Sequence, residues 1–148
     1  MNIKFSYEKG KGFVSRTDGK EKLIIKGPDS PETANSPTEL LLYGMSGCSS
    51  LDIFMILGKM RKNITEFRVD MDGEREETDP KVLKKANVHY FMSGDMSEEQ
   101  GIRAINLSLE KYCSVSILAR RGGVDLTYSL TLNGKEVATR IKPDSSDL

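Results

Sequence analysis

Apolar and polar side chains alternate over residues 3–8, a period of two that is typical of a strand with one buried face. Residues 13–17 and 23–25 form two further short apolar segments, separated by glycine-containing turns. Residues 27–35 contain two prolines together with Asp, Ser and Asn, a composition typical of a loop. The pattern therefore predicts three short strands and a loop at the start of the chain.

A long helix is predicted to begin at Ser36. This serine can cap the helix, Pro37 suits its first position because proline has no amide to leave unpaired, and Glu39 completes a capping box. Apolar and small residues follow at helical spacing as far as Gly58. Three basic residues within 59–62 lie where the helix dipole favours positive charge.

Residues 40–57 within this helix are largely apolar and approach the roughly 18 residues that span a membrane. Asp52, three serines and two glycines interrupt the segment, so we expect burial in protein and no membrane span. Gly44, Gly47 and Gly58 each weaken a helix by about 1 kcal/mol relative to alanine. We expect the close approach of another backbone to compensate.

The second half of the chain adds four alternating, strand-like segments, over residues 65–71, 88–92, 124–132 and 137–141. Asn133-Gly134 between the last two is a strong signal for a type I′ hairpin. An acidic run from Glu74 to Asp79 is predicted as a solvated loop.

A second helix is predicted after the second strand-like segment, because Ser97 and Gln100 form another capping box and an apolar face follows. We expect a break near Cys113 and a short helix over about residues 114–120. The whole is an α+β chain, and we expect residues 1–148 to form a single domain. A long apolar helix needs more cover than one such sheet supplies, which favours an obligate homodimer with both central helices between antiparallel sheets.

Composition limits the classes of function that the protein can have. The 148 residues include 22 basic and 22 acidic side chains, so no overall positive charge favours nucleic acid. Two cysteines are too few for a disulfide-stapled secreted scaffold, and the first residues lack the apolar core of a signal peptide. We therefore expect a cytoplasmic protein with reduced thiols.

The two thiols are the candidate redox groups. Cys48 lies inside the first helix with no cation beside it in sequence, so it is either a small buried apolar residue or a thiolate activated from elsewhere in the fold. Cys113 precedes a short helix whose dipole can acidify it, and simple packing beneath Tyr112 is the alternative. The single histidine, His89, is expected on a sheet face. The chain has no Cys-x-x-Cys spacing, which argues against structural zinc and thioredoxin chemistry.

The order of these motifs resembles the OsmC/Ohr family, the osmotically inducible protein C and organic hydroperoxide resistance proteins. The similarity covers nearly the whole chain. The segments that carry it are Ser36-Pro37-Thr38-Glu39-Leu40-Leu41, Gly47-Cys48, Glu110-Lys111-Tyr112-Cys113-Ser114-Val115-Ser116, Asp18-Gly19, Pro80-Lys81-Val82 and Tyr128-Ser129-Leu130.

The resemblance implies an intertwined homodimer and a cysteine-based peroxidase that reduces organic hydroperoxides in oxidative stress defence, without metal or flavin. By position, Cys48 matches the peroxide-reacting cysteine and Cys113 the resolving cysteine. A Cys48 thiolate would become a sulfenic acid, Cys113 would convert it to a disulfide, and an external dithiol would restore both.

The chain departs from the family at the residues that activate the thiolate. Efficient family members carry a carboxylate directly after the helix-start proline, where this chain has Thr38, and Glu39 follows one residue later. These family members also carry an arginine in the N-terminal strands, and Arg16 is the nearest candidate for it in this chain. Arg16 is thus either catalytic or a cation on the strand surface. Glu39 is either catalytic or a cap of the helix. The alternative function is a non-enzymatic protein that binds a small ligand in an apolar pocket at the dimer interface, with both cysteines reduced.

Overall fold

The computed structural model describes residues 1–147, and the chain contains two compact units, Met1–Leu41 and Leu42–Leu148. The first unit holds an antiparallel sheet in the order β1-β2-β3, made by β1 (Phe5–Glu8), β2 (Gly12–Ser15) and β3 (Ile24–Ile25). The rings of Phe5 and Phe13 pack edge to face, with centroids 5.7 Å apart. The three predicted N-terminal strands are therefore present.

Helix α1 (Pro37–Lys59) begins where the sequence predicted. The Ser36 amide donates to Glu39 Oε2 at 2.6 Å, and the Glu39 amide donates to Ser36 Oγ at 3.2 Å. These two reciprocal bonds form a capping box, which satisfies amides that the first helical turn leaves without partners. The helix therefore starts with the Ser36 and Glu39 amides paired.

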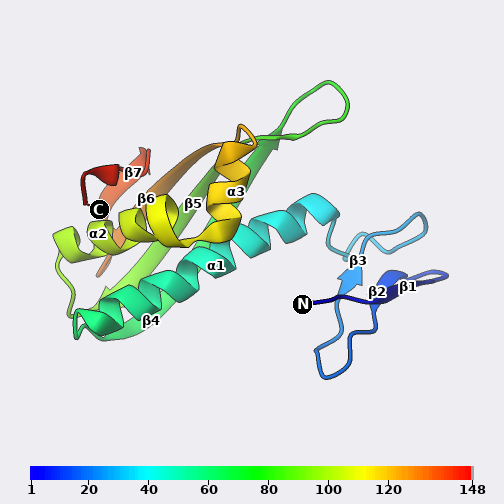
Figure 1. Ribbon diagram of the computed structural model, residues 1–148, viewed down its shortest axis with the longest axis horizontal. Coiled ribbons are helices and arrows are strands. Elements are labelled where there is room, and N and C mark those ends of the chain that lie inside the picture. Colours follow the sequence, from blue (N-terminus) through cyan, green and yellow to red (C-terminus); the bar gives the residue numbers. More distant parts are fainter. Residues whose placement is uncertain (148) are drawn as a thin grey trace. The chain divides into compact units, whose positions relative to one another are not determined.

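The second unit is a four-stranded sheet in the order β4-β5-β6-β7, with helices across one face (Figure 1). Its strands are β4 (Ile64–Arg75), β5 (Leu83–Gly94), β6 (Asp125–Leu132) and β7 (Lys135–Ile141). The helical elements that follow β5 are α2 (Glu98–Leu107), a π-helical segment (Ser108–Tyr112) and α3 (Ser114–Arg121), and a 3-10 turn (Ser145–Asp147) comes last.

The α+β class predicted from the sequence is confirmed, with one correction to the expectation of antiparallel sheets. Strands β5 and β6 run parallel, because the chain crosses over the sheet through α2 and α3 before it returns. The other neighbouring strands in this sheet are antiparallel. A second expectation was partly wrong, since β4 continues through Gly73 to Arg75 and shortens the predicted acidic loop.

Two sequence signals in this unit are confirmed in detail. Ser97 caps α2, and Gln100 completes the capping box. Asn133 and Gly134 have φ values of 49° and 78°, so both residues of the β6–β7 turn lie in the left-handed region that a type I′ turn requires.

The core of the second unit lies between the sheet and the helices. Four residues of α1, Met45, Ser49, Ile53 and Leu57, are buried at a spacing of four and form one stripe along the helix. The three apolar members of the stripe pack in a cluster with apolar side chains from β5, β6 and the α2 region, including Val88, Tyr90, Met92, Ile105, Leu109, Tyr128 and Leu130. The long helix is thus fixed to the sheet by its inner face.

The opposite face of α1 is apolar and exposed. We call Gly47, Leu51, Met55 and Gly58 the outer seam; Leu51 is 69% and Met55 61% exposed. Among the described residues, nothing lies within 4 Å of a Cβ built on Gly47 or Gly58. Helix α1 is also the one helix in the described chain that is long and apolar enough to cross a membrane, which the core helix of a soluble protein can equally be.

Candidate functional site

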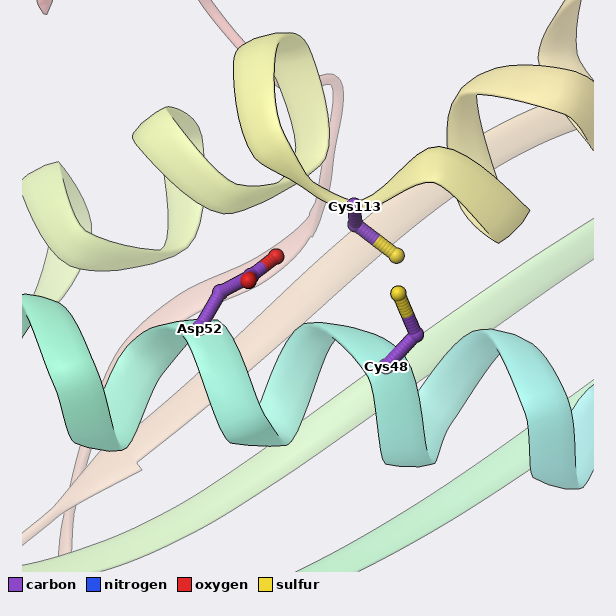
Figure 2. A group of neighbouring side chains, drawn as sticks. All are labelled: Cys48, Asp52 and Cys113. Atoms are coloured by element: carbon purple, nitrogen blue, oxygen red, sulfur yellow. The ribbon is translucent and has the colours of Figure 1, made fainter.

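Two thiols and one carboxylate meet where α1 passes the start of α3 (Figure 2). Cys48 and Asp52 project from α1, and Cys113 lies in the break between the π-helical segment and α3. The two Sγ atoms and a carboxylate oxygen all lie within 4.8 Å of one another. The two cysteines, 65 residues apart in sequence, are therefore neighbours in the fold.

The wide turn before Cys113 sets its position. The Cys113 amide donates to the Ser108 carbonyl at 2.7 Å, an i→i+5 bond that closes the π-helical segment. The backbone of Cys113 is then extended, with φ −72° and ψ 93°, and the residue becomes the N-cap of α3. The sequence predicted this break and the short helix after it.

The Cys113 sulfur is enclosed by polar partners. The Ser116 amide donates to Sγ at 3.4 Å, and the thiol donates to Ser116 Oγ at 3.0 Å, with the Met45 carbonyl at 3.8 Å. An N-cap sulfur takes the place of the hydroxyl that usually caps a helix. These contacts hold the side chain of Cys113 in one direction, toward α1.

Burial separates the two thiols. Cys113 is fully buried, whereas Cys48 is half-buried. Burial raises the pKa of the Cys113 thiol to about 11, and a hydrogen bond with Cys48 adds to this, while the hydrogen bonds with Ser116 oppose it. Cys113 is thus a protonated thiol at neutral pH, and Cys48 is the more exposed of the two residues.

Asp52 is a member of the cluster that the sequence analysis did not include. Its signal was available, since a residue four positions after Cys48 lies on the same side of a helix. Ser108 Oγ donates to Asp52 Oδ2 at 2.9 Å, so the carboxylate is oriented by the same π-helical segment that places Cys113. Asp52 also lines a cavity of about 390 Å³, with Met55, Ile56, Lys59, Met60, Leu107 and Tyr112.

Arg16 and Glu39, the other two candidate catalytic residues, belong to the N-terminal unit. Glu39 closes the capping box with Ser36, and its pKa is held below the usual value chiefly by the hydrogen bond from the Ser36 backbone. Arg16 lies on the strand surface, where it donates to Ser6 Oγ at 3.4 Å. Within this unit, Glu39 is a helix cap and Arg16 is a surface cation, the two roles that the sequence analysis weighed against a catalytic one.

His89 lies on the far face of the sheet from the helices. Its Nε2 is 2.9 Å from Thr131 Oγ1, and its ring stacks on Phe91 with centroids 3.9 Å apart. Strand alternation explains the placement, because Tyr90 on the same strand points into the core. This agrees with the sheet-face position expected from the sequence.

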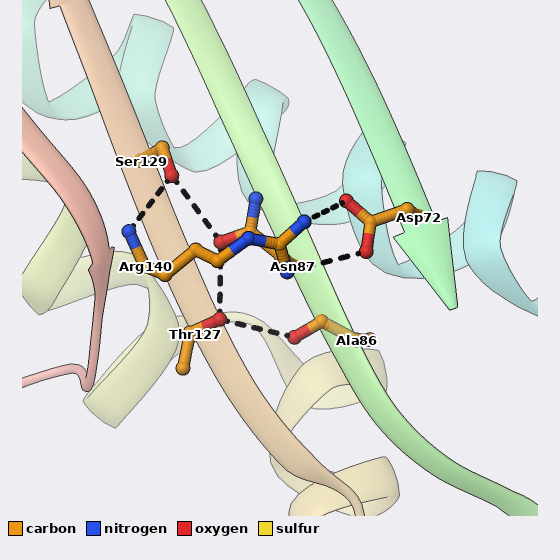
Figure 3. Close-up of polar contacts among 6 residues, drawn as sticks. All are labelled: Asp72, Ala86, Asn87, Thr127, Ser129 and Arg140. Atoms are coloured by element: carbon orange, nitrogen blue, oxygen red, sulfur yellow. Dashed lines mark hydrogen bonds and ion pairs between the residues drawn. The ribbon is translucent and has the colours of Figure 1, made fainter. Parts of the chain in front are cut away.

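A second polar cluster on that face has a structural explanation (Figure 3). Asn87 Oδ1 accepts hydrogen bonds from Thr127 and Ser129, and Ser129 Oγ accepts from the Arg140 amide at 2.9 Å. Arg140 has φ 47°, lies beside a register shift between β6 and β7, and pairs with Asp72 at 3.0 Å. The cluster satisfies the polar groups that an irregular edge of the sheet would leave unpaired.

Fold and site together define an α+β protein whose long helix presents one thiol to a second, buried thiol. The family model described as OsmC-like protein matches residues 27–129. This match spans both cysteines and more than half of the chain. The protein therefore belongs to the OsmC-like family.

Comparisons with individual proteins, by sequence and by structure, are consistent with this family assignment. The chain is 31% identical to Protein YhfA of Escherichia coli strain K12 over 130 residues, which is 87% of this chain and 96% of YhfA. A crystal structure of a hypothetical protein from Aquifex aeolicus VF5 superposes with a TM-score of 0.75 at 25% identity, covering 89% of this chain and 96% of that one. An organic hydroperoxide resistance protein OsmC from Legionella pneumophila gives a TM-score of 0.67 at 19% identity, over 88% and 97% of the two chains. The last of these similarities shows a shared fold.

Proposed function

We propose that this protein is a thiol-dependent peroxidase that reduces organic hydroperoxides with Cys48 and Cys113. The observation that carries the proposal is the close approach of a half-buried thiol to a fully buried one, with both sulfurs inside a cluster 4.8 Å across. Membership of a family with hydroperoxide-resistance proteins among its structural neighbours supports the same chemistry.

In the first step, the Cys48 thiolate attacks the terminal oxygen of the hydroperoxide. A sulfur–oxygen bond forms as the peroxide oxygen–oxygen bond breaks, and the departing alkoxide takes a proton and leaves as the alcohol. Cys48 becomes a sulfenic acid and has lost two electrons to the peroxide. Cys48 suits this role because it is the more exposed of the two cysteines.

In the second step, Cys113 resolves the sulfenic acid. The Cys113 sulfur attacks Cys48 Sγ, the hydroxyl leaves as water with the proton of Cys113, and a disulfide forms. The sulfurs must close from within 4.8 Å to about 2.05 Å. An external dithiol then reduces this disulfide by exchange, and the reductant itself becomes a disulfide.

The proposed substrate class follows from the cavity beside Asp52. Its side chains are mainly apolar, with Met55, Ile56, Met60 and Leu107 among them. Such a lining suits the hydrocarbon part of an organic hydroperoxide better than hydrogen peroxide, which has no apolar part to bury. On the family resemblance, Arg16 and Glu39 are the residues proposed to activate the Cys48 thiolate.

We propose that the working form is a homodimer joined through the outer seam of α1. Exposed apolar side chains there lack cover from the described chain, and two glycines leave room for a second backbone. In a two-fold symmetric dimer, the outer seam of one protomer would lie against the outer seam of its partner. A dimer of this kind also accounts for Gly47 and Gly58, two of the three helix-weakening glycines. We expect it to act in the cytoplasm, where both thiols are kept reduced.

The test is hydroperoxide consumption with dithiothreitol as reductant, comparing cumene hydroperoxide with hydrogen peroxide. We expect turnover to be faster with cumene hydroperoxide. Cys48→Ser should abolish it. Cys113→Ser should allow one turnover and leave Cys48 open to over-oxidation, visible as a mass gain. Turnover in Cys48→Ser equal to wild type would refute the proposal.

The alternative, a protein that binds a small apolar ligand without catalysis, is favoured by two observations. Thr38 stands where efficient family members carry a carboxylate, and burial keeps Cys113 protonated. In that case both thiols stay free after peroxide treatment. Thiol counting on peroxide-treated protein therefore separates the two functions.

A further inference from the structure

We propose that Cys48, Asp52 and Cys113 form a three-ligand site for a zinc ion. Two of the ligands come from one turn of α1, and the third comes from the N-cap of α3. The inference rests on the geometry of the three side chains, independently of any peroxide chemistry.

The spacing of the donor atoms fits a tetrahedral zinc ion. Zinc–sulfur bonds are about 2.3 Å and zinc–oxygen bonds about 2.0 Å long, which places the three ligand atoms about 3.5–3.8 Å apart. The two sulfurs and the carboxylate oxygen already lie within 4.8 Å of one another. Small side-chain rotations, which move each ligand atom by only a fraction of this distance, are enough to close the three atoms around one ion.

The types of donor select the metal. Two thiolates favour borderline and soft ions such as zinc over magnesium or calcium, which prefer oxygen ligands. Binding breaks two S–H bonds, forms two zinc–sulfur bonds and releases two protons to solvent. Three protein ligands leave the fourth position of the ion open, as in zinc sites that exchange an external ligand.

Outer contacts orient the proposed ligands. Ser108 Oγ donates to Asp52 Oδ2 at 2.9 Å and restrains the carboxylate. The Ser116 amide does the same for Cys113 Sγ at 3.4 Å. Ligands that are held in place by such outer hydrogen bonds lose little conformational freedom when the ion binds. Asp52, one of the three proposed ligands, also lines the neighbouring cavity.

A zinc ion at this site would occupy both sulfurs that the proposed peroxidase uses. The metal-bound and disulfide forms are then mutually exclusive, so zinc would block peroxide reduction and peroxide would release zinc. This consequence depends on the proposed function, whereas zinc binding itself does not.

The experiment is a competition titration of reduced protein with zinc and a chromophoric chelator, with cadmium as a spectroscopic probe. We expect one ion per chain and a cadmium–thiolate charge-transfer band. Cys48→Ser should abolish both signals. Asp52→Asn should weaken binding by about 10–100-fold, and Ser108→Ala by about tenfold. Asp70→Asn, on the exposed far face of the sheet, is the matched control and should bind like wild type.

Two results would overturn the site. One is the absence of saturable zinc binding by reduced, folded wild-type protein. The other is an unchanged affinity in folded Asp52→Asn, which would remove the carboxylate from the site. Peroxidase assays with excess chelator give an independent reading, so a failure of zinc binding and a failure of the peroxidase are separate outcomes.

Discussion

The Tyr90 hydroxyl donates a hydrogen bond of 2.6 Å to Ser49 Oγ, inside the core. Ser49 directly follows Cys48 on α1, and Tyr90 lies at the middle of β5. Burial raises the pKa of Tyr90 far above its ordinary value, so the phenol remains protonated and a donor. Ser49 in turn donates to the Ser46 carbonyl at 3.0 Å. The bond ties the rotation of α1, and with it the direction of Cys48, to the sheet.

We predict that Tyr90→Phe lowers the free energy of unfolding by about 1 kcal/mol, because it removes one buried hydrogen bond and leaves the ring in place. Urea denaturation measures this change. Tyr43→Phe, at an exposed position on the same helix as Ser49, is the control and should leave the midpoint where it was. Equal effects of the two substitutions would show that the buried bond contributes nothing.

Alkylation should distinguish the two cysteines. We predict that iodoacetamide modifies Cys48 at least tenfold faster than Cys113 at neutral pH, because Cys113 is buried and its pKa of about 11 leaves very little thiolate. Peptide mass spectrometry after timed quenching, in the presence of a chelator, gives both rates. Urea-unfolded protein is the control, in which the two rates should become similar. Faster reaction at Cys113 would contradict the assignment of Cys48 as the peroxide-reacting thiol.

The outer seam provides a test of the dimer. Leu51→Asp places a charge in the middle of the seam, and we predict that it converts the dimer to a monomer at micromolar concentration. Light scattering coupled to size exclusion measures the mass. Leu118→Asp changes an equally exposed leucine on α3 and should leave the mass unaltered. A wild-type protein that is monomeric at every concentration would remove the seam as an interface.

The pH dependence of stability should reveal the capping role of Glu39. Its pKa is lowered in the folded protein, chiefly by the hydrogen bond from the Ser36 backbone. A lowered pKa stabilises the fold above the ordinary value of 4.5 and loses that contribution as pH falls through the folded value. We predict that the urea midpoint of wild type falls more steeply below about pH 4.5 than that of Glu39→Gln.

The same variant separates capping from catalysis. Glutamine can still accept the Ser36 amide, so a pure cap tolerates Glu39→Gln with little change in peroxide turnover. A loss of turnover of tenfold or more, with the fold intact by circular dichroism, would instead assign Glu39 to the activation of Cys48.

Local patterns predicted most of the fold because each depends on residues close together in sequence. The capping box at Ser36 and Glu39 and the turn at Asn133-Gly134 are short-range devices, and both have the expected geometry. The parallel pairing of β5 with β6 was not predictable in this way. It depends on the path of α2 and α3 over the sheet, which no alternating pattern encodes.

The site was predictable only in part. The cysteines could be named as candidates, but their proximity depends on the π-helical segment and on the register of α1 against Tyr90. Asp52 was weighed only as a charge that interrupts an apolar helix. Its place beside Cys48 follows from helical spacing, whereas its approach to Cys113 required the packing of two distant segments.

The π-helical turn over Ser108–Tyr112 holds one residue more than an α-helix of the same length would use. Wound as an ordinary α-helix, the same residues would instead rotate position 113 by about 100°. The sheet and the long helix would be untouched, yet the second sulfur would no longer face the first. In this scaffold, the meeting of the two thiols therefore depends on how a single turn is wound.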